Sequence, residues 1–377
     1  MTPQVGRPVQ DLPLRRLLLI IIPILDLRKD IHADDGVNHD PGDKVSSMSK
    51  LQSNADGLHV AARVIPVPTT ISPEAQEALR QPNPYGGVLE PDAADKAAWE
   101  VRTREGNQAF TQMLAARVAA EQPASISEVR LARAMLYEIR PTTLAANHTD
   151  KAVYYVHGGG FTTGGGRAAA YAAFGIAKLT GLPTFSIDYR MPPQFPFPSA
   201  LDDAVDAYRF VLDHYRAANI AIYGPSAGGG LAASCLLKAR DVGLPMPAAC
   251  VLHSPEADLT ESGDSFETNH GVDPVLKRLT QSIALYANGH DLRDPYLSPL
   301  FGDFKKGFAP TLLTAGTRDL FLSNTVLMHR ALRRAGVPAT LDIWEAMGHA
   351  GFYGQAPEDH EVLQEHADFI VDHLRAR

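Results

Sequence analysis

Residues 220–230 of the chain read Ile-Ala-Ile-Tyr-Gly-Pro-Ser-Ala-Gly-Gly-Gly. The first four are apolar and predict a short buried strand, while the residues from 227 onward predict a helix. Between them, residues 224–228 match the pattern Gly-x-Ser-x-Gly, with Ser226 at its centre. In a strand–turn–helix unit this pattern holds the serine in a strained backbone conformation with its hydroxyl exposed. We therefore predict Ser226 to be a nucleophile; the alternative is a structural turn whose serine caps the helix.

Strand-like and helix-like segments alternate along the rest of the chain. Short apolar strands alternating with helices indicate a mostly parallel sheet with helices on both faces, the α/β class. Ligands of such sheets bind beyond the carboxyl ends of the strands, so a catalytic residue is expected just after a strand. A strand or hairpin is expected over 127–139, further strands over 151–156, 183–187, 220–223, 248–252, 311–315 and 340–344, and helices over 168–178, 200–216, 227–240, 324–335 and 361–374.

A glycine-rich run directly follows the strand expected at 151–156. Residues 157–161 read His-Gly-Gly-Gly-Phe. Glycines let a backbone approach closely and expose N–H groups, which a tetrahedral acyl intermediate needs around its oxyanion. We predict that the amides of Gly159, Gly160 and Ala227 form an oxyanion hole. The alternatives are a flexible glycine loop and a phosphate cradle, but the glycine spacing of neither common phosphate-binding loop occurs here. The second run, residues 164–166, is expected to be a mobile loop leading into a helix.

A serine nucleophile needs a base, and the base needs an acid that orients it. The order along the chain in this kind of fold is Ser, then Asp or Glu, then His. Asp319 follows the strand expected at 311–315 and His349 follows the last one, at 340–344. We predict Asp319 as the acid and His349 as the base. Glu256 and Asp258 are the fallback acids, because they follow the strand at 248–252.

The composition narrows the classes of function. The chain has 377 residues and a formal net charge of −8 at pH 7. A net negative charge repels the phosphate backbone of nucleic acids, so nucleic acid is not expected as a partner. Only two cysteines occur, in apolar surroundings, and the histidines show no metal-ligand spacing. We predict two buried thiols, no metal and no disulfide.

Several motifs in register resemble the hormone-sensitive-lipase-like family of bacterial esterases. The matching segments are His-Gly-Gly-Gly-Phe at 157–161, Asp-Tyr-Arg at 188–190, Phe-Pro-Phe-Pro at 195–198, Ala-Leu-Asp-Asp at 200–203, Ser-Pro at 254–255 and Asp-Pro-Tyr-Leu-Ser-Pro at 294–299. The resemblance implies an α/β-hydrolase core with an N-terminal helical cap, and hydrolysis of short-to-medium acyl esters without a cofactor. It also departs from the family: Pro225 and Asn324 stand where relatives usually carry acidic residues.

The resemblance leaves substrate alternatives open. Some relatives act on lactones, so a lactone hydrolase on the same site is an alternative to an esterase. An amidase or peptidase, and a non-catalytic ligand receptor on this fold, are the others. The expected partner is a small-molecule ester. A homodimer through the C-terminal strand and helix at the sheet edge is possible in this arrangement.

The domain organisation follows from these patterns. Residues 1–47 are expected outside the fold, 48–125 to form the cap region, and 126–377 the catalytic domain with an insertion near 256–299. The apolar run from Leu17 to Leu25 is too short for a membrane span. It fits the apolar part of a secretory signal, but no Ala-x-Ala cleavage site follows. A cytoplasmic location is therefore expected, or secretion if this run is a signal peptide.

Overall fold

The computed structural model describes residues 52–54, 57–81, 89–121, 124–142 and 149–375. The chain divides into two compact units, 1–64 and 65–377. In the first unit, β1 (Gln52–Asn54) and β2 (Gly57–His59) pair as an antiparallel hairpin. The segment 1–47, with its apolar run, lies outside the described residues.

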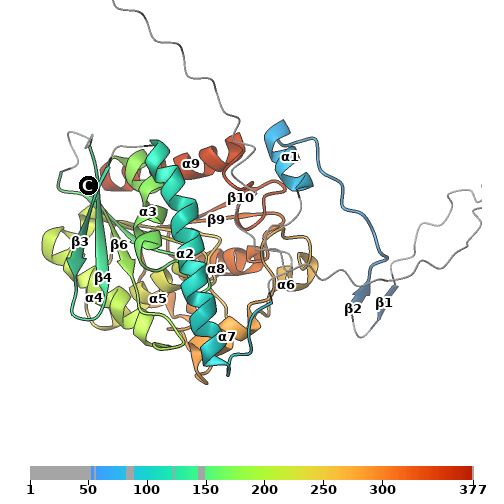
Figure 1. Cartoon of the computed structure of the whole chain (residues 1–377), viewed down its shortest axis with the longest axis horizontal. Helices are drawn as coiled ribbons and strands as arrows, with labels where there is room; N and C mark the ends of the chain where they lie inside the picture. Colours follow the sequence, from blue (N-terminus) through green and yellow to red (C-terminus); the bar gives the residue numbers. More distant parts are fainter. Residues whose placement is uncertain (1–51, 55–56, 82–88, 122–123, 143–148, 376–377) are drawn as a thin grey trace, which may run out of the picture. The chain divides into compact units, whose positions relative to one another are not determined.

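The second unit is built on a sheet of eight strands (Figure 1). Across the sheet the order is β10-β9-β8-β7-β5-β6-β4-β3. The neighbours from β10 to β6 run parallel, whereas β4 is antiparallel to both β6 and β3. The predicted α/β class is confirmed. The strands are β3 (Ala124–Arg130), β4 (Met135–Pro141), β5 (Ala152–Val156), β6 (Thr184–Asp188), β7 (Ile220–Pro225), β8 (Ala249–His253), β9 (Thr311–Gly316) and β10 (Ala339–Trp344).

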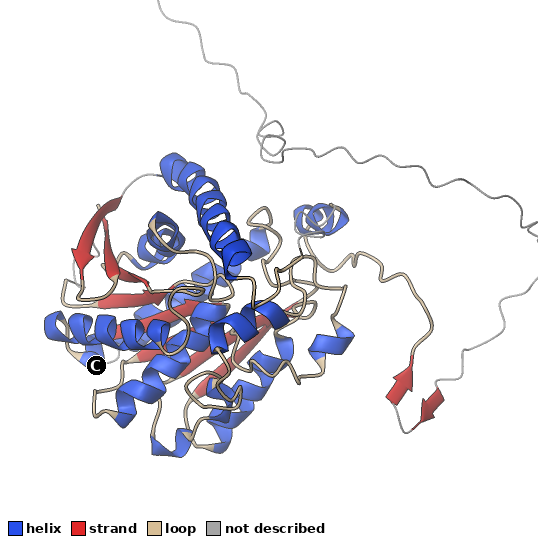
Figure 2. Ribbon diagram, turned by 60° about the horizontal axis from the view of Figure 1, so that its bottom comes forward, coloured by secondary structure: helices blue, strands red, loops and turns tan. Residues whose placement is uncertain are grey.

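Helices cover both faces of this sheet (Figure 2). One face packs against α3 (Arg167–Thr180) and α9 (Pro357–Arg375), and the other against α4 (Ser199–His214), α5 (Ala227–Asp241) and α8 (Leu322–Arg334). The two faces divide the side chains of each strand alternately. In β5, Val153 and Tyr155 belong to the first core and Tyr154 and Val156 to the second. Because both faces are buried, β5 is apolar throughout instead of alternating with polar residues.

The remaining helices lie in the region expected to form a cap and in the long insertion. α1 (Pro73–Arg80) is capped by Ser72, whose backbone N–H and hydroxyl both donate to Glu358 of α9. α2 (Lys96–Glu121) packs against α3. The insertion contributes α6 (Ser265–Thr268) and α7 (Thr280–Ala287). Within the described residues, no helix is both long and apolar enough to cross a bilayer. The domain boundaries themselves stay a prediction.

Close packing of α5 gives a stability prediction. A Cβ added to Gly230 would lie 2.1 Å from the backbone oxygen of Glu256, whereas one added to Gly175 in α3 would meet nothing within 4 Å. We expect Gly230→Ala to destabilise the protein by more than about 4 kcal/mol or to prevent its accumulation, because backbone cannot yield as a side chain can. Gly175→Ala is the matched control and is expected to be neutral or to stabilise by up to about 1 kcal/mol. Denaturant unfolding of both variants measures this; equal midpoints would contradict the packing argument.

Candidate active site

The turn between β7 and α5 holds Ser226 in a left-handed backbone conformation. Its φ is 56° and its ψ is −131°, and it is the N-cap residue of α5. A non-glycine residue with such angles costs about 1–3 kcal/mol, a strain that clusters at functional sites. The first turn of α5 also lies very close to β5, since a Cβ on Gly228 would be 2.1 Å from the backbone oxygen of Val156. Gly228, two residues after the serine, therefore allows the nucleophile turn and the glycine loop after β5 to lie in contact.

Pro225 fits this turn without losing a ladder hydrogen bond. The N–H of Ser226 donates to the carbonyl of His253 in β8 at 2.9 Å. In a parallel strand, the backbone N–H and C=O groups of successive residues point alternately to the two neighbouring strands. Since Ser226 points to β8, the backbone groups of Pro225 point to β5. The position of the Pro225 carbonyl supports this direction, because a Cβ on Gly158, just after β5, would lie 2.9 Å from the Pro225 oxygen. Pairing of β5 with β7 ends at Tyr155 and Tyr223. The missing N–H thus falls beyond the last pair, where proline is tolerated.

The glycine loop lies directly against the nucleophile. A Cβ on Gly158 would be 3.1 Å from Cβ of Ser226. Gly159 has a φ of 121° and Gly160 a φ of 57°, angles that other residues rarely adopt. The carbonyl of Gly159 accepts from the backbone N–H of Thr163 at 3.0 Å, which closes the loop into a turn. The structure therefore brings Gly159 and Gly160 to the same end of the sheet as Ala227.

The side chain of Tyr189 holds the start of this loop in place. The ring of His157 is 1% exposed and stacks on Tyr189 with centroids 4.0 Å apart. The Tyr189 hydroxyl donates to the carbonyl of His157 at 3.0 Å. Burial lowers the pKa of His157 to about 4, so the ring is neutral. Next along the chain, Arg190 forms an ion pair with buried Asp203, 2.9 Å from Nε to Oδ2. The Asp-Tyr-Arg segment thus supports the glycine loop through Tyr189, and its arginine is held by Asp203 of the Ala-Leu-Asp-Asp segment.

The second glycine run packs against the first. A Cβ on Gly164 would lie 2.6 Å from the carbonyl oxygen of Gly158 and 2.9 Å from Nδ1 of His157. The N–H of Gly165 donates to the side chain of Asn107 in α2 at 3.1 Å. A mobile loop was expected here, but these residues pack closely against the first glycine run. The hydrogen bond to Asn107 also connects them to α2.

Three side chains from distant parts of the chain meet at this edge. His349 Nε2 lies 2.9 Å from Ser226 Oγ, and His349 Nδ1 lies 3.3 Å from Asp319 Oδ1. Asp319 follows β9 and His349 follows β10, so each side chain comes from the carboxyl end of its strand. Asp319 is 1% exposed. The structure therefore brings together the three residues that the sequence selected as nucleophile, acid and base.

The charges of the cluster favour an ionised acid beside the base. Burial raises the pKa of Asp319, but the nearby His349, its hydrogen bond and donation from Ser254 outweigh burial, so the pKa lies below its ordinary value. Burial lowers the pKa of His349, but the charge and hydrogen bond of Asp319 and the charge of Asp273 outweigh it, so the pKa lies above its ordinary value. Each group thus favours the charged form of the other.

Sequence reasoning missed three residues of this cluster. Ser254 contacts both Asp319 and His349. Asp273 accepts from the backbone N–H of Leu320 at 2.8 Å and of His349 at 3.3 Å, so one carboxylate holds both catalytic loops. Asn269 donates to the carbonyl of Asp319 at 2.8 Å. Ser254 could have been found, since it follows β8 directly. The other two lie in the irregular insertion, where no pattern marks them.

The fallback acids do not contact His349. Asp258 accepts instead from the backbone N–H of Thr260 at 2.9 Å and from its hydroxyl at 2.6 Å. Glu256 is 1% exposed, and neither of its carboxyl oxygens has a hydrogen-bond partner among the described residues. Burial raises the pKa of Glu256 to about 8. Asn324, the other departure from the family, is buried in α8, and nothing in the structure explains it.

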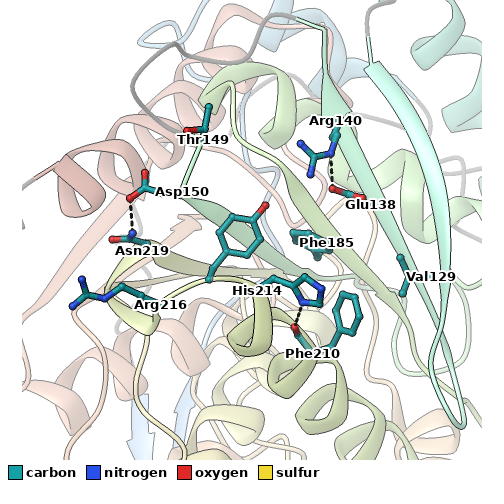
Figure 3. Close-up of a pocket in the computed structure, with 11 residues that line it drawn as sticks. Val129, Glu138, Arg140, Thr149, Asp150, Phe185, Phe210, His214, Arg216 and Asn219 are labelled. Carbon is teal, nitrogen blue, oxygen red and sulfur yellow. Dashed lines mark hydrogen bonds and ion pairs between the residues drawn. The ribbon is translucent and has the colours of Figure 1, made fainter.

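A cavity of about 550 Å³ lies away from this cluster (Figure 3). Asp150 and Asn219, hydrogen-bonded at 2.8 Å, line it just before β5 and β7. It therefore lies at the amino ends of these strands, whereas ligands of open α/β sheets bind at the carboxyl ends. The lining residues are Val129, Glu138, Arg140, Thr149, Asp150, Phe185, Phe210, His214, Tyr215, Arg216 and Asn219.

The sheet order, the serine turn and the Ser–His–Asp cluster define an α/β-hydrolase, and comparison with known proteins agrees. A family model described as alpha/beta hydrolase fold matches residues 153–353. An acetyl-hydrolase of Streptomyces hygroscopicus is 31% identical over 230 residues, covering 60% of this chain and 77% of its own. A solved esterase structure superposes with a TM-score of 0.77 at 32% identity, covering 85% of this chain and 99% of its own.

A second solved structure narrows the family. An esterase from the bacterial hormone-sensitive lipase family superposes with a TM-score of 0.70 at 28% identity, covering 80% of this chain and 99% of its own. The chain belongs to the α/β-hydrolase-fold family, among the hormone-sensitive-lipase-like bacterial esterases.

Proposed function

We propose that Ser226 is the nucleophile of a carboxylic-ester hydrolase and that His349 and Asp319 activate it. The chain is a carboxylic-ester hydrolase by its family and its named relatives. The observation that carries the residue roles is the contact of 2.9 Å between His349 Nε2 and Ser226 Oγ, made by a strained serine at the start of a helix. A hydroxyl becomes an effective nucleophile when a positioned base removes its proton.

The reaction transfers the acyl group first to the enzyme and then to water. Ser226 Oγ attacks the ester carbonyl while its proton passes to His349 Nε2. The amides of Gly159, Gly160 and Ala227 stabilise the negative oxygen of the tetrahedral intermediate. His349 then gives the proton to the leaving alcohol. Water, deprotonated by His349, attacks the acyl-enzyme and releases the carboxylic acid. The chemistry requires no cofactor.

Asp319 holds the imidazole in the required form. The base must carry its proton on Nδ1, so that Nε2 is free to accept the proton of Ser226. Ionised Asp319 favours this tautomer and stabilises the imidazolium that forms during attack. Because only neutral His349 can act as a base, kcat/KM falls as the pH drops through its raised pKa.

We propose esters of short-to-medium acyl chains as substrates. The names of relatives support this choice: one is an acetyl-hydrolase, and another, from Pseudomonas putida and 31% identical over 209 residues, is an ethyl acetate hydrolase. The proposed partner is therefore a small-molecule ester. We also propose a cytoplasmic location, or secretion if residues 17–25 are a signal. We further propose a homodimer through β10, the strand at one edge of the sheet, and the C-terminal helix α9.

A substrate panel tests the proposed function. We expect p-nitrophenyl acetate and butyrate to be hydrolysed with higher kcat/KM than the decanoate ester, simple lactones or the matching p-nitroanilides, and a fluorophosphonate to stop the reaction by labelling Ser226. Faster turnover of lactones or anilides would replace the proposed substrate class. A protein that neither turns over any member of the panel nor reacts with the phosphonate would be a receptor, not an enzyme.

A further inference from the structure

The hydroxyl of Ser254 lies between the acid and the base of the proposed triad. Ser254 is 1% exposed and is the first residue after β8. Its Oγ lies 2.7 Å from His349 Nδ1 and donates to Asp319 Oδ2. Its backbone N–H donates to the carbonyl of Thr314 in β9 at 2.7 Å, and its φ is 45°. The strand ends of β8, β9 and β10 thus converge on one hydroxyl group.

This hydroxyl is closer to the imidazole than the carboxylate is. The 3.3 Å between His349 Nδ1 and Asp319 Oδ1 exceeds the usual N–H···O range of about 2.7–3.2 Å, so that direct bond is weak. The 2.7 Å to Ser254 falls at the short end of the same range. In this geometry Ser254 is the nearer acceptor for an N–H on Nδ1.

Counting protons decides which way the hydroxyl acts. Ser254 has one O–H and can donate it either to Asp319 or to His349 Nδ1, but not to both. A carboxylate is the stronger acceptor because the bond is charge-assisted, so the O–H points to Asp319. The oxygen then offers only lone pairs to His349, which can pair with Nδ1 only if Nδ1 carries the proton. That leaves Nε2 free to accept from Ser226.

We propose that Ser254 is a positioning residue that links Asp319 to His349 through hydrogen bonds and keeps the imidazole proton on Nδ1. The proposal rests on the proposed function, since it acts on the base of that triad. Without the hydroxyl, His349 would have to move toward Asp319 to regain a bond of normal length, which changes its contact with Ser226. A displacement of this kind lowers the rate of a chemical step more than it weakens substrate binding.

The test uses Ser254→Gly and Ser254→Ala. Glycine adopts a φ of 45° freely, so this variant removes the hydroxyl without adding backbone strain. We expect kcat for p-nitrophenyl butyrate to fall about 100-fold in both variants with KM changed little. We also expect ¹⁵N spectra of histidine-labelled protein at high pH to show His349, assigned with His349→Gln, losing Nδ1–H population in favour of Nε2–H. The matched control is Ser186→Ala, which removes another buried serine hydroxyl, one that donates to the carbonyl of Ala169 at 2.7 Å.

Each outcome decides the proposal. A folded Ser254→Gly protein with wild-type kcat and an unchanged tautomer would overturn it. Equal losses of kcat in Ser254→Gly and in Ser186→Ala would also overturn it, because the effect would then be general to buried hydroxyls. The proposed function fails separately: if Ser226→Ala still turns over ester, the triad itself is wrong, whatever the Ser254 variants do.

Discussion

Replacing Ser226 by alanine is expected to remove ester hydrolysis, with a loss in kcat of up to about 10⁶-fold, as for nucleophile removal in other serine hydrolases. The physical reason is that, among the described residues, the other hydroxyl hydrogen-bonded to the imidazole cannot replace it. The hydroxyl of Ser254 is directed to Asp319 and lies at Nδ1 of His349, whereas only Ser226 lies at Nε2. Initial rates with p-nitrophenyl acetate and butyrate, normalised to folded protein, measure the loss.

A second serine of α5 provides the control for this experiment. Ser234 is 1% exposed, and its hydroxyl has no hydrogen-bond partner among the described residues. Ser234→Ala removes a buried polar group that nothing satisfies, so we expect unchanged kcat and stability equal to or above that of the wild type. Turnover by purified Ser226→Ala within about tenfold of the wild type would refute the nucleophile assignment, because residual catalysis without a nucleophile is far smaller.

The fold and the central cluster could be predicted because they depend on local patterns. The central strands β5, β7, β8 and β9 are apolar because both their faces are buried, whereas the edge strand β10 is only partly covered. A parallel sheet aligns the carboxyl ends of all these strands at one edge. Ser226, Asp319 and His349 each follow a strand of this parallel sheet, so their meeting followed from strand assignment and chain order alone. The glycines at 158–160 were informative for the same reason, since they too follow a strand.

The supporting residues could not be predicted because they depend on tertiary geometry. Asp273 lies in the irregular insertion and reaches the catalytic loops only once β9 and β10 are placed. The role of Gly164 as packing against His157 requires the distance between two turns, which no periodicity encodes. Pro225 departs from the family at the serine turn, and its fit there follows only from the pairing of β5 and β7, which ends two residues earlier. In each case the missing information was a tertiary contact that no local sequence pattern encodes.

The second large effect is expected from Asp319→Asn, which should lower the plateau of kcat by about 10⁴-fold, the size seen when a wrong histidine tautomer results. An amide accepts less strongly than a carboxylate, so the Ser254 hydroxyl becomes free to donate to His349 Nδ1. The proton of the neutral ring then moves to Nε2, where it blocks acceptance from Ser226. The remaining activity should also change in pH dependence. Asp319 raises the pKa of His349, so losing its charge lowers that pKa and moves the acidic limb of kcat/KM to lower pH.

Asp258→Asn separates this effect from the loss of any buried carboxylate. Asp258 is also 1% exposed and accepts several hydrogen bonds, but from Thr260 and Ser262 and not from His349. We expect this variant to be less stable, with kcat within about threefold of the wild type and an unmoved acidic limb, because its bonds are structural. If Asp258→Asn instead showed the large loss of kcat and the shifted acidic limb of kcat/KM, the catalytic acid would be Asp258, which follows β8. The contacts of Asp319 argue against that result, since its carboxylate reaches both the imidazole and the hydroxyl that orients it.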